Sequence, residues 1–424
     1  MIRMPTALRR SLCVAALLVV AACGDDGAGR SDEPRTAMRY APTPDADPFY
    51  APPTPLPDVE PGTILNSRAV QFAPLGLPLP YPAWQLQIMS SDLQGRPQAA
   101  IATVVQPLLP ALTGGKPLLS YQFAINSAGL KCAPSHQLTG SRDNLNSQLE
   151  AAEYLPLLLS QGWTIVFPDH LGPTSSVAVG RIAAPIVLDG IRAALQFEPL
   201  GLPGNETKVG LLGYSGGALA TTWAAALQPD YAPELNIVGV AAGGLPANLE
   251  TTVKAFENGA AFNIAFGAVV SVNRVFPQLL PPGLLNAEGE RLAEAVKDGC
   301  LGATTDGSQG PSGQLSDYTT VSDPYATPGA RDVLPQLRLP QPGEVPTAEI
   351  YFYHQRFDQL APLSEVDPVV AAWCEAGTRI HYFQDFTGEH YAGAGTSAPS
   401  EYLYLISRYA GLPAVVPPGT QTCN

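Results

Sequence analysis

The stretch KVGLLGYSGGALATTWAAAL, residues 208–227, places one serine, Ser215, between glycines at the end of an apolar run. The residues before Ser215 read as a buried parallel strand, and those after it are strong helix formers. Because Gly213 and Gly217 carry no Cβ, the strand and the helix can approach closely while the turn between them exposes the serine hydroxyl. The pattern predicts a nucleophile elbow at Ser215. The alternative is a plain tight turn in a glycine-rich chain.

Segments of strand and helix character alternate on both sides of this serine. Strands are expected at Ile64–Phe72, Trp84–Ser90, Ala99–Gln106, Pro117–Ile125, Trp163–Pro168, Lys208–Leu212, Ile237–Ala242, Glu349–Tyr353 and Arg379–Phe386. Helices are expected at Glu150–Gln161, Pro185–Phe197, Leu363–Glu375 and Glu401–Tyr409. Strands that alternate with helices predict an α/β fold, with a mostly parallel sheet covered by helices on both faces.

The alternation stops between about residues 245 and 346. Lys254–Asn273 is apolar at helical spacing, Glu288–Lys297 reads as a second helix, and residues 302–346 read as a loop. An insertion of this length between core strands predicts a helical cap. We expect its apolar helix to cover the substrate pocket, because it carries more hydrophobic surface than a solvated helix should expose.

A catalytic serine needs a base within hydrogen-bond reach and an acid that orients the base. In sheets of this type the order along the chain is serine, acid, histidine, and the chemistry lies at the carboxyl ends of the strands. Three histidines follow Ser215. His354 ends a strand and His381 lies within one, whereas His390 lies in the glycine-rich segment FTGEHYAGAG after the last core strand. His390 is therefore the predicted base.

The predicted acid is Asp358, which follows the strand that precedes the last core strand. Asp385 is the alternative, but its position within a strand favours a structural role. His170, in the segment PDHLG, precedes the serine and so breaks the expected order; we expect it to make a loop or cap contact.

Composition and charge further restrict the classes of function that the protein can have. The chain has 424 residues, of which 46% are hydrophobic and 14% charged, and its net charge is −14. This composition is typical of a globular protein. The acidic balance, without a visible basic patch, argues against a nucleic-acid partner. A serine triad needs no metal and no cofactor.

The N-terminus has the pattern of a bacterial export signal. Residues 1–22 contain three arginines followed by the short apolar segment Leu12–Ala22, and they end in VAAC. Small residues before a cysteine favour lipidation of Cys23, with an ordinary signal peptide as the alternative. The Pro-rich residues 23–62 are then expected to form an extended tether, and residues 63–424 the catalytic domain.

Cysteine usage also indicates an oxidising compartment. Beyond the export signal and Cys23, four cysteines remain, which allow three pairings. We expect Cys132–Cys300 and Cys374–Cys423. A zinc site is not expected, because the four lie far apart without Cys-x-x-Cys spacing.

The sequence resembles the secretory lipase family. The resemblance runs from about residue 47 to the C-terminus, through the segments DPFYAPPTPLP, SYQFAINSAGLKCAPS, FPDHLGPTSS, VLDGIRAAL, GYSGGALAT, DQLAP and GEHYAGAG in this order. It implies an α/β-hydrolase fold with a helical cap and activity on esters of fatty acids. It also implies that Ser215, Asp358 and His390 are nucleophile, acid and base, the same residues that the pattern of the chain predicts.

One position departs from the family pattern. The family has an aspartate that contributes to the oxyanion hole where this chain has Asn126. Asparagine can serve there, since its amide donates hydrogen bonds without first taking up a proton; the alternative role is that of a turn residue. The second donor is expected to be the backbone N–H of Gly216, directly after the nucleophile.

These observations predict a lipid-anchored, exported serine ester hydrolase that acts on acylglycerols or other fatty-acyl esters through an acyl-enzyme. Its partners would be the ester substrate and, through the lipid anchor, a membrane. An acyltransferase that uses the same acyl-enzyme is one alternative. A solute-binding or structural envelope lipoprotein with an inactive site is another. Oligomeric state is not predicted.

Overall fold

The structure is a computed structural model that describes residues 38–259, 261–300 and 313–424. The expected signal peptide (residues 1–22), the candidate lipidation site Cys23 and the tether up to residue 37 lie outside the described residues. Among the helices that are described, none has both the length and the hydropathy needed to cross a bilayer.

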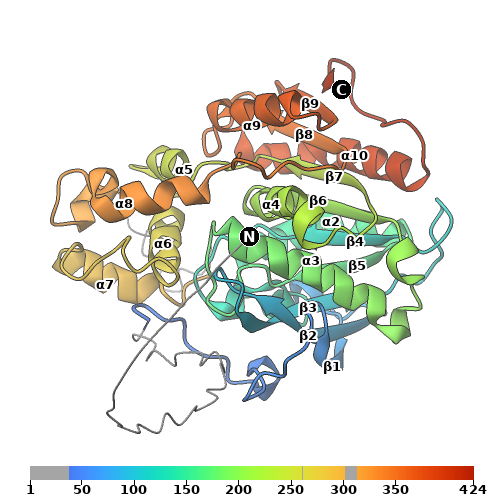
Figure 1. Ribbon diagram of the computed structural model, residues 1–424, viewed down its shortest axis with the longest axis horizontal. Coiled ribbons are helices and arrows are strands. Elements are labelled where there is room, and N and C mark those ends of the chain that lie inside the picture. The colour runs from blue at the N-terminus through green and yellow to red at the C-terminus, as the bar shows by residue number, and fades with distance from the viewer. Residues whose placement is uncertain (1–37, 260, 301–312) are drawn as a thin grey trace, which may run out of the picture. The chain divides into compact units, whose positions relative to one another are not determined.

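The described strands form one ten-stranded sheet in the order β1-β2-β3-β5-β4-β6-β7-β8-β9-β10 (Figure 1). The strands are β1 Ile64–Gln71, β2 Pro82–Ser91, β3 Pro97–Val105, β4 Leu118–Gln122, β5 Thr164–Pro168, β6 Val209–Tyr214, β7 Ile237–Gly243, β8 Ile350–Gln355, β9 Ile380–Asp385 and β10 Gln421–Cys423. The strands from β5 to β9 pair in parallel, whereas β1, β2, β3 and β10 pair antiparallel at the two edges. The predicted mostly parallel sheet is confirmed.

Helices flank this sheet and form the insertion between β7 and β8. They are α1 Pro134–Gln137, α2 Leu145–Ser160, α3 Gly180–Gln196, α4 Gly216–Tyr231, α5 Leu249–Phe256, α6 Phe262–Asn273, α7 Ala287–Val296, α8 Pro328–Val333, α9 Leu363–Glu375 and α10 His390–Tyr409. Of the helices on the sheet, α3 packs beside α4, and α2 contacts α10 through a hydrogen bond from the Tyr402 hydroxyl to the carbonyl of Tyr154.

Two glycines of β6 show that α4 and α10 lie on opposite faces of the sheet. A Cβ on Gly213 would lie 2.5 Å from backbone atoms of Gly217 in α4. A Cβ on Gly210 would lie 2.5 Å from the hydroxyl of Tyr409 in α10. Because successive side chains of a strand point to opposite faces, positions 210 and 213 face opposite sides. The predicted helices on both faces are therefore present.

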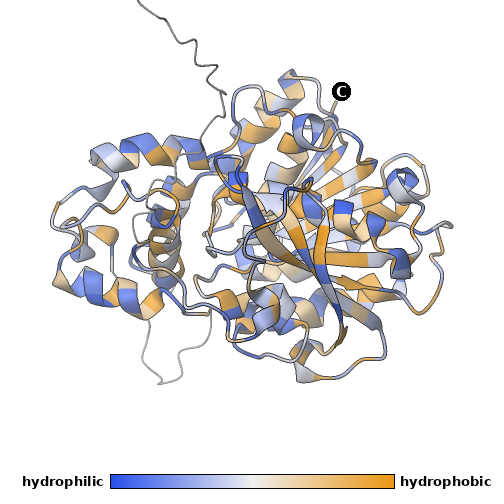
Figure 2. Cartoon of the chain, turned by 60° about the horizontal axis from the view of Figure 1, so that its bottom comes forward, coloured by the Kyte–Doolittle hydropathy of each residue, from blue (hydrophilic) through white to orange (hydrophobic). Residues whose placement is uncertain are grey.

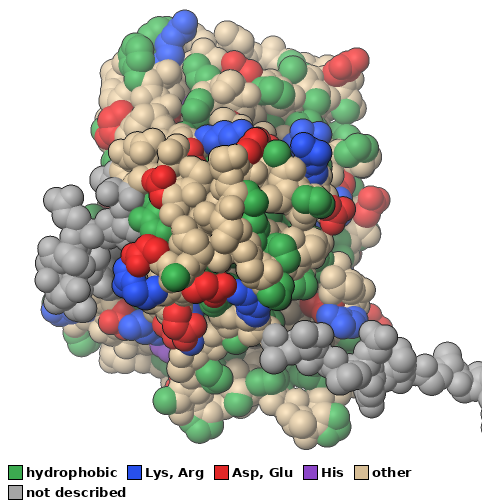
Figure 3. Space-filling model, turned by 90° about the vertical axis from the view of Figure 1, so that its left-hand side faces the viewer, with side chains coloured by type: hydrophobic (Ala, Val, Ile, Leu, Met, Phe, Trp, Pro, Cys, Tyr) green, Lys and Arg blue, Asp and Glu red, His purple; other side chains and the backbone are tan. Residues whose placement is uncertain are grey.

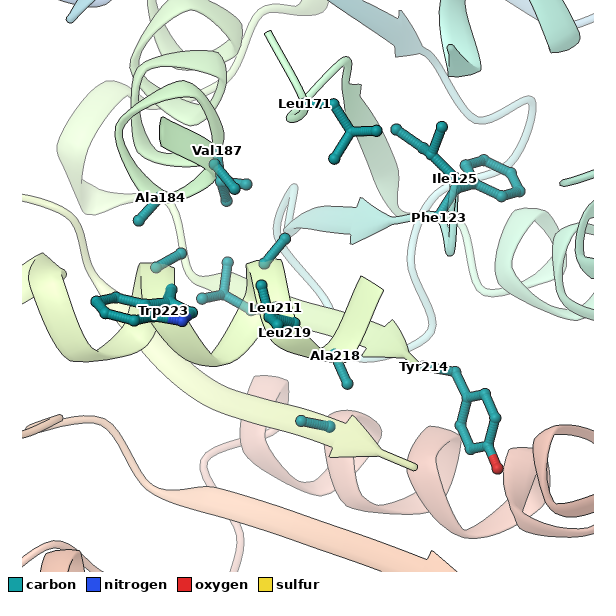
Figure 4. Close-up of a cluster of buried hydrophobic side chains, with 14 of the residues drawn as sticks. Phe123, Ile125, Leu171, Ala184, Val187, Leu211, Tyr214, Ala218, Leu219 and Trp223 are labelled. Atoms are coloured by element: carbon teal, nitrogen blue, oxygen red, sulfur yellow. The ribbon is translucent and has the colours of Figure 1, made fainter. Parts of the chain in front are cut away.

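The core lies between the sheet and these helices. Hydrophobic residues follow the strands and parts of the flanking helices (Figure 2). Trp223 of α4 is fully buried and lies near Ala184 and Val187 of α3 (Figure 4). A Cβ on Gly180 would lie 2.1 Å from the Trp223 ring, so the close approach of these two helices requires glycine at position 180.

The insertion differs in detail from its sequence prediction. The expected single helix Lys254–Asn273 is broken into α5 and α6, because Asn258 adopts a φ of 59° and an Asn-Gly dipeptide favours a turn. The expected loop over residues 302–346 is also wrong in part. Beyond residue 312 it contains α8 and the short 3₁₀ helices Leu315–Tyr318, Pro324–Ala326 and Leu334–Leu337.

The last helix begins earlier than its residue preferences suggest. α10 starts at His390 rather than near Glu401, although its first half contains two glycines and a proline. These glycines are needed for packing, since a Cβ on Gly393 would lie 2.0 Å from the Gln355 side chain and one on Gly395 would lie 2.2 Å from that of Glu153. Tertiary packing thus outweighs local helix propensity here. The short edge strand β10 is also not predicted.

The Pro-rich segment before residue 63 is packed against the body of the protein. Arg39 forms an ion pair with Glu290 in α7 at 2.7 Å, and Phe49 is buried. Asp47 forms a second ion pair, with Arg68 of β1 at 2.6 Å. The expectation of an extended tether is therefore wrong for residues 38–62, which belong to the same compact unit as the sheet.

Both expected disulfides are present. Cys132–Cys300 joins the segment after β4 to the insertion, and Cys374–Cys423 joins the end of α9 to β10. The first bond links residues 168 positions apart, so it ties the insertion to the sheet.

One buried cation, Arg274, connects the N-terminal segment, two loops of the sheet and the insertion. The guanidinium of Arg274, just after α6, donates hydrogen bonds to the carbonyls of Tyr40, Ala128, Thr174 and Lys297 at 2.7–2.9 Å. These carbonyls belong to the N-terminal segment, the loops after β4 and β5, and the end of α7. Burial lowers the pKa of Arg274 to about 10, so the side chain remains a cation at neutral pH.

We expect Arg274→Met to lower the free energy of unfolding by about 3 kcal/mol or more, because the carbonyls that it binds would lose a charged donor. The matched control is Arg291→Met in α7, whose ion pair with Glu288 is exposed. Figure 3 shows the cap side of the molecule, where acidic and basic side chains are interspersed on the surface. Urea denaturation checks both variants. An Arg274→Met midpoint as close to wild type as that of the control would contradict this role.

Candidate active site

Ser215 occupies the turn between β6 and α4. Its backbone has φ 53° and ψ −122°, a strained conformation for a residue with a Cβ. The turn depends on close approach of its neighbours, because a Cβ on Gly217 would lie 2.0 Å from the carbonyl oxygen of Gln122 in β4. The N–H of Ser215 donates to the carbonyl of Gly243 at the end of β7. The expected strand–turn–helix geometry is therefore present.

The structure brings Ser215, His390 and Asp358 into one hydrogen-bonded chain. The Oγ of Ser215 lies 2.8 Å from Nε2 of His390, and Nδ1 of His390 lies 2.7 Å from Oδ2 of Asp358. With the proton on Nδ1, His390 donates to the carboxylate and its Nε2 accepts from the serine hydroxyl. His390 is the first residue of α10, where the carboxylate of Glu389 caps the helix.

Asp358 is held in place in the loop after β8. Its Oδ1 accepts hydrogen bonds from the N–H groups of Leu360 and Ala361 at 2.9 and 2.7 Å. Burial alone would raise the pKa of Asp358, but the hydrogen bond from His390 and the charges of His390 and His354 hold it below its usual value. The carboxylate is therefore ionised at neutral pH and oriented toward the imidazole.

The alternative acid, Asp385, serves a different purpose. Its Oδ1 accepts from the N–H and the hydroxyl of Thr387 at 2.8 and 2.7 Å, which stabilises the turn after β9. His381 contacts Thr422 and Glu349. These contacts lie within the sheet edge rather than at Ser215.

Two supporting residues were not found from the sequence. The hydroxyl of Tyr214 lies 2.6 Å from the carbonyl of His390 and 3.0 Å from Oε1 of Gln355. Nε2 of His354 lies 2.6 Å from the carbonyl of Ala361, in the loop that carries the aspartate. Tyr214 is the variable residue of the Gly-x-Ser-x-Gly pattern, so the motif alone carries no signal for this contact.

Asn126 lies beside Gly216 at the elbow. A Cβ on Gly216 would lie 2.1 Å from Oδ1 of Asn126, so the amide occupies the space that the glycine leaves open. Asn126 has a φ of 44°, a backbone conformation that asparagine tolerates better than most residues. The structure thus brings together the two residues expected to hold the oxyanion.

Polar side chains of α2 and its N-cap hold the loop that carries Asn126. The buried carboxyl group of Glu150 accepts from the N–H of Ala124 at 2.9 Å and lies in hydrogen-bond contact with the hydroxyl of Tyr121 at 2.8 Å. Nδ2 of Asn144 donates to the carbonyl of Ile125 at 3.1 Å. The loop position is therefore determined by hydrogen bonds to its main chain.

A pocket opens at Ser215, with an empty volume of about 740 Å³ that includes its mouth. Its wall includes Ser215, His390 and Asn126, and it is otherwise mainly apolar. The insertion lines it through residues such as Val253, Phe256, Ile264, Ala265 and Ala268 of α5 and α6. The expected apolar segment of the cap does border the pocket.

His170 also lies on this wall and is almost fully buried. Burial lowers its pKa to about 4, so the imidazole is neutral at neutral pH. His170 lies in the loop after β5, at the wall of the pocket and outside the hydrogen-bonded chain of Ser215, His390 and Asp358. Among the described residues, no group of three or more His, Cys, Asp and Glu side chains has an arrangement that could hold a metal ion.

A mostly parallel sheet with a serine elbow after β6, an aspartate after β8 and a histidine after β9 defines an α/β hydrolase. The chain belongs to the secretory lipase family, whose model matches residues 138–416. It is a lipase-type hydrolase by family.

Individual proteins resemble this chain in sequence, and a solved structure resembles it in fold. The chain is 33% identical to a probable inactive lipase of Mycobacterium tuberculosis, over 92% of this chain and 88% of the relative. It is 31% identical to lipase 5 of Candida albicans, over 87% and 81% of the two chains. Among solved structures, Candida antarctica lipase A in its closed state superposes with a TM-score of 0.77 at 26% identity, covering 88% of this chain and 87% of the other.

The buried Glu150 predicts a pH-dependent stability. Burial raises its pKa to about 8, whereas in an unfolded chain the pKa of the same group is about 4.3. The folded state therefore holds a proton that the unfolded state loses, so this stabilisation is present at low pH and disappears as the pH rises to about 8. Glu150→Gln keeps the neutral form at every pH.

We expect the melting temperature of Glu150→Gln, relative to wild type, to increase between about pH 5 and pH 9. Calorimetry across this range measures the difference. Glu206→Gln, at an exposed carboxylate, controls for the loss of one negative charge. A difference from wild type that stays constant with pH would show that Glu150 is ionised in the folded protein throughout.

Proposed function

We propose that the protein is an exported serine ester hydrolase that cleaves acylglycerols or other fatty-acyl esters through an acyl-enzyme on Ser215. The observation that carries this proposal is the continuous hydrogen-bonded chain Ser215–His390–Asp358 at the wall of an apolar pocket. Family membership supports a lipase-type hydrolase, and the apolar pocket supports a hydrocarbon acyl group.

In the first half of the reaction, Oγ of Ser215 attacks the ester carbonyl while Nε2 of His390 takes its proton. Negative charge develops on the carbonyl oxygen, which accepts hydrogen bonds from the N–H of Gly216 and the amide of Asn126; the position of Asn126 beside Gly216 supports this assignment. Asp358 stabilises the imidazolium and keeps its orientation. His390 then gives the proton to the leaving alcohol, and an acyl group remains on Ser215.

In the second half, water takes the place of the alcohol. His390 removes a proton from the water as its oxygen attacks the acyl carbonyl, and the same two donors hold the second oxyanion. His390 returns the proton to Oγ, and the fatty acid leaves. The hydrogen bonds from Ser215 to His390 and from His390 to Asp358 support both halves of this reaction.

We expect Ser215→Ala, Asp358→Ala and His390→Ala each to lower kcat by about 10³-fold or more, with folding retained. Because the three act as a unit, a double variant should be little worse than a single one. Ester hydrolysis and labelling of Ser215 by a fluorophosphonate measure the effect. Labelling also tests whether Ser215 is unreactive, since one relative is named a probable inactive lipase.

The matched control is Asp385→Asn, which alters a carboxylate that caps the turn after β9 instead of contacting His390. It should hydrolyse esters at close to the wild-type rate. Loss of activity in Asp385→Asn together with an active Asp358→Ala would assign the acid to Asp385 instead. A wild-type protein that neither reacts with the probe nor cleaves esters would contradict the whole proposal.

For Asn126→Ala we expect kcat to fall by about 10²–10³-fold with little change in KM, because the lost hydrogen bond forms only in the transition state. Asn126→Asp has the same shape and tests the donor directly. A protonated carboxyl can donate, whereas a carboxylate repels the oxyanion, so its rate should fall as the pH rises through its pKa. Wild-type kcat in Asn126→Ala would leave Asn126 as a turn residue.

We also propose that the enzyme is a lipoprotein anchored at Cys23. Support comes from the sequence VAAC after a short apolar segment, and from two disulfides, which are typical of exported proteins. Cys23→Ser should release active enzyme from the membrane fraction of a bacterial host that lipidates exported proteins. Retention of this variant in the membrane would contradict the anchor.

A further inference from the structure

A second cavity adjoins the Ser215 pocket. It lies between the N-terminal segment 38–52, strands β2 and β3, and the loop 169–175, and its empty volume of about 1150 Å³, which includes its mouth, exceeds the 740 Å³ of the first. The reaction described above does not use it.

The two cavities share part of their walls. Ile125 and Leu171 line both, and they lie next to each other in the structure (Figure 4). The loop after β5 contributes to both cavities: residues 172–175 line the second cavity, and residues 177–179 line the Ser215 pocket. The cavities are therefore neighbours with Ile125 and Leu171 in a shared wall.

The polar groups of the second cavity already have partners in the protein. Asp169 accepts from the N–H and hydroxyl of Ser135 at 3.0 and 2.6 Å. Gln87 donates to two main-chain carbonyls, and Asp45 pairs with His136 at 2.7 Å. Its other polar side chains, Tyr50, Thr174 and Ser175, are likewise hydrogen-bonded. The remaining lining is mostly aliphatic, so the cavity is suited to a hydrocarbon chain.

We propose that this cavity holds the distal part of a long acyl chain, which passes from the Ser215 pocket beyond Leu171. The inference rests on the proposed function and specifies its substrate class as esters of long-chain fatty acids. The carbons next to the ester lie in the first pocket, because the nucleophile and Asn126 are there. The shared wall at Ile125 and Leu171 is aliphatic, so displacing a side chain there to admit the acyl chain costs van der Waals contacts and no hydrogen bond.

The test fills the second cavity and compares chain lengths. Ala133→Phe and Thr174→Phe each place an aromatic ring in it from a half-buried position, and Ala111→Phe, at a half-buried alanine outside both cavities, is the control. The substrates are methyl butyrate, methyl palmitate and hexadecyl acetate. We expect the palmitate-to-butyrate ratio of kcat/KM to fall about tenfold in both filled variants, the equivalent of roughly two methylene groups left unburied. The control should keep the wild-type ratio.

A binding measurement separates this inference from the proposed function. In the Ser215→Ala background, parinaric acid, an 18-carbon fluorescent fatty acid, should bind about tenfold more weakly when either filling substitution is added. The same loss of binding in a protein without esterase activity would support the cavity while the proposed function fails.

Three results would overturn the inference. In the first, the filled variants cleave the esters with the wild-type palmitate-to-butyrate ratio. In the second, hexadecyl acetate loses rate instead of methyl palmitate, which would assign the cavity to the alcohol part. In the third, probe binding is unchanged. Thr174→Phe decides if Ala133→Phe does not fold.

Discussion

The strained turn at Ser215 is the constraint on which the rest of the structure depends. A residue with a Cβ at positive φ costs about 1–3 kcal/mol, so its neighbours must hold it there. β6 and α4 do so by approaching each other through Gly213 and Gly217, and the carbonyl of Gly243 fixes the serine N–H. The parallel order of β4, β6, β7, β8 and β9 then places the loops with Asn126 and Asp358 and the start of α10 with His390 at the same edge of the sheet.

The reactive groups are also oriented by residues with no part in the chemistry. Glu150 and Asn144 bind the main chain of the Asn126 loop, and Tyr214 binds the carbonyl of His390. Arg274 joins that loop to the cap through carbonyl dipoles alone. Main-chain contacts of this kind fix the path of the chain while leaving the catalytic side chains free to exchange protons.

Local patterns explain why the triad was predictable. Ser215 lies in a compact motif, and Asp358 and His390 follow strands whose order along the chain restricts their roles. The early start of α10, in contrast, depends on contacts of its glycines with Gln355 and with α2, which are distant in sequence. The Arg274 contacts and the packed N-terminal segment also depend on long-range partners, and prolines suggested a tether where the structure has a packed segment. Such features carry no local signal.

The pair formed by Gly216 and Asn126 limits how this site can evolve. Any side chain at position 216 would occupy the space of the Asn126 amide, so a larger residue at position 216 is acceptable only after a smaller one has replaced Asn126. Exchange of asparagine for aspartate at position 126 needs no such order, because the two have the same shape and leave the clearance above Gly216 intact. Position 126 can therefore change between asparagine and aspartate by a single substitution, with the backbone of the elbow unaltered.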